Sequence, residues 1–272
     1  MPELAKRNVT QAIKEIHLTS FLISYVILLA HFSLLKVGQN LIKKQGMEEF
    51  SKAQYKIRLY SGQGDNLPCV YTLLYDDRCD DLYHEIAKIP CHTHHLVCIY
   101  GLSWFTDMTP WKADISSKMA DWFKPGAEAF LKVLTDEIIP ETEKRISDPP
   151  SLRVLCGYSL AGMFSLWTAT RTTLFSRVGS FSGSLWYPGF TGYLEKTPFT
   201  GQIDRVYISV GDREKLSKDP QMALTESAAR DCADLISSRG IPVRFELNSG
   251  DHNHAENWRS AKGIRALVNK RF

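Results

Sequence analysis

Short apolar segments alternate with longer amphipathic ones from residue 47 to the end of the chain, and this pattern most constrains the fold. "HHLVCIYG" and "DRVYISVG" are typical of buried strands, whereas "MALTESAARDCADLISSRG" has apolar residues at helical spacing. Strands separated by helices are joined by right-handed crossovers, which gives a mostly parallel sheet with helices on both faces. Further strands are predicted at "AQYKIRLYSG", "PCVYTLLY", "LRVLCG", "RVGSFSG" and "VRFELNSG", and further helices at "EAFLKVLTDEIIPETEKRI", "AGMFSLWTAT" and "WRSAKGIRALVNK". The sequence therefore predicts an α/β fold.

Length and charge narrow the possible classes of protein. A chain of 272 residues that is 44% hydrophobic and 23% charged has the composition of a globular protein, and its length suits one large α/β domain. Residues 1–46 hold six Lys or Arg and two Glu, a charge of +4, so residues 47–272 carry −1 of the chain's net +3. This nearly neutral body has no electrostatic footprint for nucleic acid or for an anionic membrane surface.

The first 46 residues differ from the rest. Residues 18–35, "LTSFLISYVILLAHFSLL", contain no Asp, Glu, Lys or Arg, and as a helix they would span about 27 Å. The segment could be a membrane anchor, an accessory helix packed on the body, or a stretch upstream of a true start at Met47. The change of composition after Gly46 favours the third interpretation. We therefore expect one α/β domain at residues 47–272, with a membrane partner only if residues 18–35 are an anchor.

The six cysteines show no disulfide framework, and several lie inside apolar runs such as "HLVCIYG". Buried free thiols are typical of a reducing compartment, so we expect a cytoplasmic protein. Cys91, His92, His94 and His95, with His84 nearby, form a second group of potential metal ligands. They have no partner pair at metal-site spacing, so we predict a histidine-rich loop and neither a metal nor a cofactor.

The segment "GYSLAG", residues 157–162, has the pattern of a nucleophile elbow after a predicted strand. Small residues two positions either side of the serine allow a sharp strand-to-helix turn, where a larger side chain would clash. Ser159 is thus a candidate nucleophile, and the backbone N–H of Leu160 could face a developing oxyanion. A serine that merely caps the helix is the alternative.

Two later strand ends carry the other groups that a catalytic triad needs. "GDRE" offers Asp212 and Glu214, and "SGDHNH" offers His252 and His254. Hydrolases of this architecture order their triad as serine, acid and histidine along the chain, as here. The pattern predicts a triad but leaves open which acid and which histidine belong to it.

Five segments in order resemble the putative-esterase family of α/β hydrolases, which includes enterochelin-type siderophore esterases, S-formylglutathione hydrolase and feruloyl esterases. They are "GLSWFTDMTPW" (101–111), "GYSLAGMF" (157–164), "SGSLWYPGF" (182–190), "SVGDRE" (209–214) and "NSGDHNHAENWR" (248–259). The resemblance covers residues 48–272. It implies an α/β-hydrolase fold with Ser159 as nucleophile, Glu214 as acid and His252 as base.

The resemblance also implies which loops surround the expected site. The His-Gly or Asp-Gly that often supplies an oxyanion N–H is replaced by "YDDRCDD", so we expect Asp77 N–H as the second donor. Trp104, Trp111 and Trp186 lie in loops that should line the substrate pocket, together with Asp107.

The function implied is that of a serine esterase, with a small-molecule carboxylic ester as its substrate and an acyl-enzyme intermediate. An acyltransferase on the same scaffold, which would pass the acyl group to an alcohol, is one alternative. A non-catalytic binding protein with this fold is the other, and it would resist labelling by a fluorophosphonate. The sequence leaves the particular ester and the oligomeric state open.

Overall fold

The structure is a computed structural model that describes residues 46–115 and 120–270. The predicted anchor or accessory helix at residues 18–35, and most of the segment 1–46, lie outside the described residues. Within the two described ranges, no helix is both long enough and apolar enough to cross a membrane.

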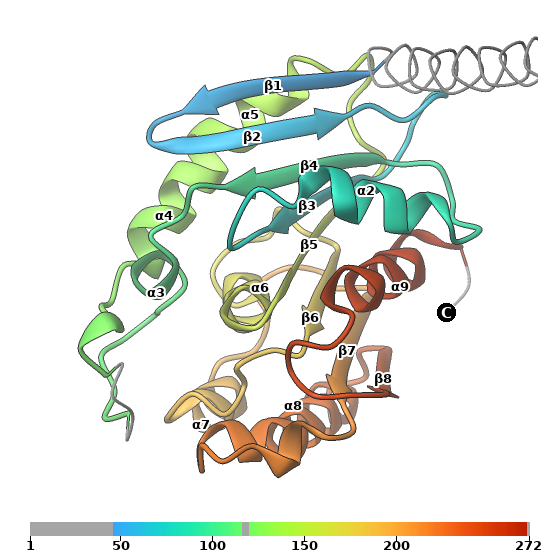
Figure 1. Cartoon of the computed structure of the whole chain (residues 1–272). Helices are drawn as coiled ribbons and strands as arrows, with labels where there is room; N and C mark the ends of the chain where they lie inside the picture. The colour runs from blue at the N-terminus through green and yellow to red at the C-terminus, as the bar shows by residue number, and fades with distance from the viewer. Residues whose placement is uncertain (1–45, 116–119, 271–272) are drawn as a thin grey trace, which may run out of the picture. The chain divides into compact units, whose positions relative to one another are not determined.

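Eight strands of the described residues form one mostly parallel sheet, in the order β1-β2-β4-β3-β5-β6-β7-β8 (Figure 1). The strands are β1 (Met47–Lys52), β2 (Tyr55–Tyr60), β3 (Cys69–Leu73), β4 (His95–Tyr100), β5 (Arg153–Tyr158), β6 (Arg177–Phe181), β7 (Arg205–Gly211) and β8 (Val243–Asn248). β2 is antiparallel to β4, whereas the six strands β3 to β8 are parallel to one another. The predicted α/β fold is confirmed.

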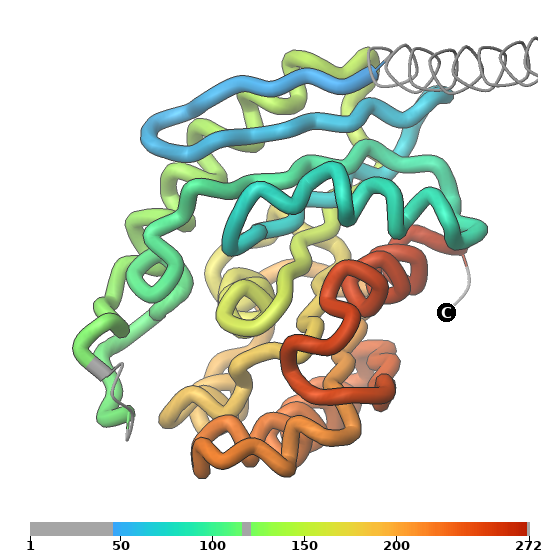
Figure 2. Tube along the Cα trace, in the orientation of Figure 1, coloured from blue at the N-terminus to red at the C-terminus, as the bar shows by residue number. Residues whose placement is uncertain are grey.

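Helices cover both faces of this sheet. α2 (Cys79–Ala87) and α9 (Glu256–Val268) share one apolar core with it. The other core holds α4 (Ala127–Val133), α5 (Ile139–Glu143), α6 (Leu160–Ala169), α7 (Phe190–Lys196) and α8 (Thr225–Ser238). All ten residues of α6 are buried, which explains why this helix is apolar on every side. Figure 2 follows the chain from the blue edge strands to the orange and red strands at the other edge.

Short helices fill the loops at the carboxyl ends of the strands. They are α3 (Trp104–Asp107), η1 (Ala120–Trp122), η3 (Glu214–Leu216) and η4 (Met222–Leu224). The single helix predicted over "EAFLKVLTDEIIPETEKRI" is interrupted, because a π-helical turn, η2 (Leu134–Ile138), separates α4 from α5. Pro140, in the first turn of α5, has no N–H to donate to the preceding turn, which accounts for the change of hydrogen-bonding pattern.

The sequence reasoning missed the helices α2, α3 and α7 and was right about the thiols. "YDDRCDD" was not predicted to be helical, yet α2 begins at Cys79 within it and buries Leu82 and Ile86. All six cysteines are free, and five of them are buried. Burial raises the pKa of the Cys156 thiol to about 12, so this thiol stays protonated and packs as an apolar side chain.

Candidate functional site

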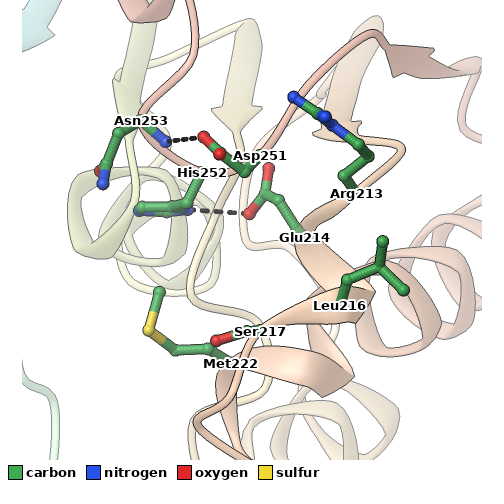
Figure 3. A pocket seen from close by; sticks show the side chains of 8 residues that line it. All are labelled: Arg213, Glu214, Leu216, Ser217, Met222, Asp251, His252 and Asn253. Carbon is green, nitrogen blue, oxygen red and sulfur yellow. Dashed lines mark hydrogen bonds and ion pairs between the residues drawn. The ribbon is translucent and has the colours of Figure 1, made fainter.

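The three predicted triad side chains meet at the carboxyl ends of the strands. Ser159 follows β5, Glu214 lies just after β7, and His252 lies in the loop after β8. His252 Nε2 is 3.1 Å from Ser159 Oγ, and His252 Nδ1 is 2.8 Å from Glu214 Oε2. Figure 3 shows the side chains of Glu214 and His252 pointing toward each other. The arrangement is that of a nucleophile, a base and an acid joined by hydrogen bonds.

Ser159 lies on a strained turn between β5 and α6. Its φ of 57° and ψ of −124° are unusual for a residue with a side chain, a conformation that costs about 1–3 kcal/mol. A Cβ at Gly157 would lie 2.4 Å from Cβ of Ala161, and one at Gly162 would lie 2.8 Å from Oγ of Ser180. The two glycines therefore allow the close approach of strand and helix that the turn requires.

Glu214, and not Asp212, lies beside the histidine. Its carboxylate is 3% exposed, and its Oε1 accepts a hydrogen bond from the Gly211 N–H at 2.7 Å. Burial by itself would raise the pKa of Glu214, but hydrogen bonds from His252, the Gly211 N–H and Ser182 hold it below the usual range. Asp212 Oδ1 instead accepts from the Gly250 N–H at 2.9 Å, which ties the loops after β7 and β8 together.

The backbone around Ser159 offers donors for an oxyanion. Leu160 is the first residue of α6, where N–H groups have no acceptor within the helix. Asp77, the second predicted donor, does not line the described cavities beside Ser159, and its carboxylate accepts from Arg58 at 3.0 Å. Tyr75 does line one of them together with Ser159. Tyr75 is therefore a further candidate for the second donor, beside Asp77.

Three cavities meet at His252. The apolar cavity, of about 150 Å³, is lined mainly by Trp104, Phe105, Ile115, Phe123, Leu160 and Trp186, next to Ser159. The polar cavity, of about 200 Å³, is lined by Ser159 and by groups that include Tyr75, Arg78, Tyr158, Asn253 and Glu256. The outer cavity, of about 360 Å³, lies against the Glu214 side of the histidine and is shown in Figure 3. Ser159 thus has a cavity on each side of it.

Two of the four predicted pocket residues lie elsewhere. Trp104 and Trp186 line the apolar cavity, as predicted. Trp111 is not among the described lining residues, because its Nε1 donates to the Pro188 carbonyl at 3.0 Å and its ring packs on Phe190. Asp107 is also absent from the lining, since its carboxylate is buried and accepts from the Ser103 N–H at 2.8 Å. These two residues shape the loops and do not face the cavities.

The histidine-rich segment lies at the opposite end of the sheet. His95 begins β4 and pairs with Cys69 at the start of β3, whereas Ser159 follows the end of the parallel strand β5. The His95 ring accepts from the Gly62 N–H at 3.3 Å, and Cys91 Sγ lies 3.9 Å from His94 Nδ1. No group of three or more potential ligands in the described residues could hold a metal ion.

Sequence reasoning gave no role to Arg259 or Tyr158, although both lie in motifs of the resemblance. Arg259 is fully buried on α9, and its Nη1 donates to the Tyr158 hydroxyl at 2.9 Å, which in turn donates to the His252 carbonyl at 2.7 Å. Arg259 precedes Gly263 and Ala266 by four and seven residues, a spacing that puts it on the buried face of the helix. An arginine on an apolar helix face was the signal available in the sequence.

A family model matches the part of the chain that contains the three predicted triad side chains. Residues 108–261, more than half of the chain, match a family model described as "Putative esterase". The uncharacterised protein YbbA of Bacillus subtilis is 28% identical over 167 residues, which cover 58% of this chain and 66% of that protein. The chain therefore spans about two thirds of the length of this relative.

Solved structures establish the fold. An IroE-like serine hydrolase from Shewanella oneidensis matches with a TM-score of 0.67 at 16% identity, covering 82% of this chain and 79% of that one. The siderophore hydrolase EstB from Aspergillus nidulans matches with a TM-score of 0.62 at 17% identity, covering 82% and 95%. At these identities the similarity shows the α/β-hydrolase fold.

Proposed function

The chain belongs to the putative-esterase family of carboxylic ester hydrolases, and from this premise we propose that it cleaves its ester through an acyl-enzyme on Ser159. The observation that carries the proposal is the chain of hydrogen bonds from Ser159 Oγ through His252 to Glu214. A fold alone would not support a mechanism, since one fold hosts many functions.

The reaction proceeds in two halves. Ser159 Oγ attacks the ester carbonyl while His252 Nε2 takes its proton, and the histidine then gives that proton to the departing alcohol. Water, deprotonated by His252, attacks the acyl-enzyme; the bond from the acyl carbon to Ser159 Oγ then breaks, the histidine returns the proton to Oγ, and the acid is released. Glu214 accepts the hydrogen bond from Nδ1 throughout, which fixes the tautomer and stabilises the imidazolium.

The N–H groups of Leu160 and Tyr75 bind the negative oxygen of the tetrahedral intermediate. Leu160 contributes from the N-terminus of α6, where the helix dipole also favours negative charge. Each such donor is worth about 3 kcal/mol of transition-state stabilisation.

The two cavities beside Ser159 bind different parts of the substrate. The apolar cavity takes the acyl group, and at about 150 Å³ it is smaller than the pockets that hold drug-sized ligands, which favours a short or flat acyl group. The polar cavity takes the alcohol, because Arg78, Asn253 and Glu256 can hydrogen bond to it. The similarity to a siderophore hydrolase makes siderophore esters the first natural class to test. The free thiols support a reducing, cytoplasmic location.

The proposal is tested with a panel of esters that vary first in the acyl group and then in the alcohol. We expect Ser159→Ala to lower kcat/KM by more than about a thousandfold on every ester that the wild type cleaves. Acetyl and benzoyl esters should be preferred over octanoyl esters. Ser165→Ala is the matched control, because this serine lies in α6, the helix that follows Ser159, and its hydroxyl donates to the Ala161 carbonyl. Equal turnover by Ser159→Ala and the control would overturn the proposal.

A further inference from the structure

One buried guanidinium reaches the ends of four strands. Arg259 is 0% exposed, and it extends from α9 toward the loops that carry the proposed triad. Its Nη1 donates to the Tyr158 hydroxyl at 2.9 Å, to Ser182 Oγ at 3.1 Å and to Glu214 Oε1 at 3.4 Å. Its Nη2 donates to the carbonyls of Ser249 at 2.9 Å and Asp251 at 2.8 Å. These five acceptors follow or end β5, β6, β7 and β8.

The acceptors lie next to the reacting side chains in the chain. Tyr158 directly precedes Ser159, and its hydroxyl also donates to the carbonyl of His252 at 2.7 Å. Asp251 directly precedes His252. Arg259 therefore binds the carbonyl of Asp251, just before the histidine, directly, and it binds the carbonyl of His252 through the Tyr158 hydroxyl.

Space around the guanidinium is closely limited. A Cβ at Gly211 would lie 2.8 Å from Nη2 of Arg259 and 2.2 Å from the Gly250 carbonyl. A buried charge is strongly destabilising without partners, and both terminal nitrogens of Arg259 have them, whereas its Nε has no hydrogen-bond partner among the described residues. Only a planar fork with several donors can serve acceptors in four loops, which a lysine ammonium cannot do.

We propose that Arg259 is a positioning residue of the ester hydrolase: its guanidinium fixes the His252 loop and the Glu214 carboxylate so that the imidazole points at Ser159. This inference rests on the proposed function. Arg259 touches no cavity beside Ser159 among the described residues, so it acts through the triad and not on the substrate.

The test compares Arg259→Lys, Arg259→Met and Tyr158→Phe with the wild type. Active sites are first counted by titration with a fluorophosphonate, so that misfolded protein does not enter kcat. We expect Arg259→Lys to lower kcat per active site about 10- to 100-fold with little change in KM, because displacements of about 1 Å can cost about a hundredfold. Arg259→Met should lower kcat per active site further, again with little change in KM. Tyr158→Phe should give a smaller loss.

Arg205→Lys is the matched control. Arg205 is also buried, and it donates to the Ala266 and Asn269 carbonyls at the other end of α9. This variant should keep the wild-type kcat per active site even where it unfolds more easily. Wild-type kcat per active site in both Arg259 variants would overturn the inference, leaving Arg259 a structural residue. Failure of the wild type itself to be labelled would instead overturn the proposed function.

Discussion

At the scale of single residues, two carboxylates that are close in sequence occupy different environments. Glu214 is buried and contacts His252 Nδ1, whereas Asp212 contacts the Gly250 N–H. Reasoning from residues alone left both open, and only the family resemblance favoured Glu214. The position of each acid in the sequence does not show which one contacts the histidine. The turn into η3 determines which side chain points back toward the end of β7.

Replacing each acid by its amide should show which of the two acts with His252. Glu214→Gln should lower kcat/KM by roughly 10⁴-fold, because an amide stabilises the wrong histidine tautomer. Asp212→Asn should cost less than about tenfold, since its remaining carbonyl oxygen can still accept from Gly250. Both variants are measured on one ester, with folding checked by circular dichroism. The opposite order of losses would mean that the acid is misassigned.

At the scale of elements, the turn from β5 to α6 was predictable because its constraint is local. "GYSLAG" contains the small residues that a close strand-helix approach needs, and the structure has Gly157 and Gly162 at the tight contacts. The second oxyanion donor and the directions of the loop tryptophans were harder to predict. Trp104 and Trp111 belong to one motif, yet only Trp104 faces a cavity, because the direction of each ring depends on packing against distant residues such as Phe190.

The glycine contacts give a prediction for this turn. Gly157→Ala should destabilise the protein by about 1–3 kcal/mol, because its Cβ would lie 2.4 Å from that of Ala161. The same displacement should lower kcat by at least about tenfold. Gly192→Ala in α7 is the control, since a Cβ there meets nothing within 4 Å and alanine favours a helix. Unfolding by urea and turnover of one ester check both variants. Equal effects of the two substitutions would contradict this account of the turn.

At the scale of the whole molecule, binary patterning was enough to predict the parallel core of the sheet. Strands β3, β4 and β7 are buried along their whole length, so they appear as continuous apolar runs. β1 could not be predicted in this way, because no residue of "MEEFSK" is fully buried at the sheet edge. Arg259 was missed for a related reason, since only the assembled strand ends give a buried arginine its partners. The boundary at Met47 stays a prediction.

The central claim is that Ser159 is the nucleophile, and the most direct measurement of it is the site of covalent modification. His252 Nε2 lies 3.1 Å from Ser159 Oγ. The hydroxyl of Ser184 is a competing nucleophile within the same site, because its Oγ lies 3.4 Å from Ser159 Oγ. The protein is treated with a fluorophosphonate, and the adduct is located by mass spectrometry of its peptides. The account predicts one adduct, on Ser159, that is absent in Ser159→Ala and present in Ser165→Ala. An adduct on Ser184 or elsewhere, or ester turnover by a protein that takes no label, would contradict it.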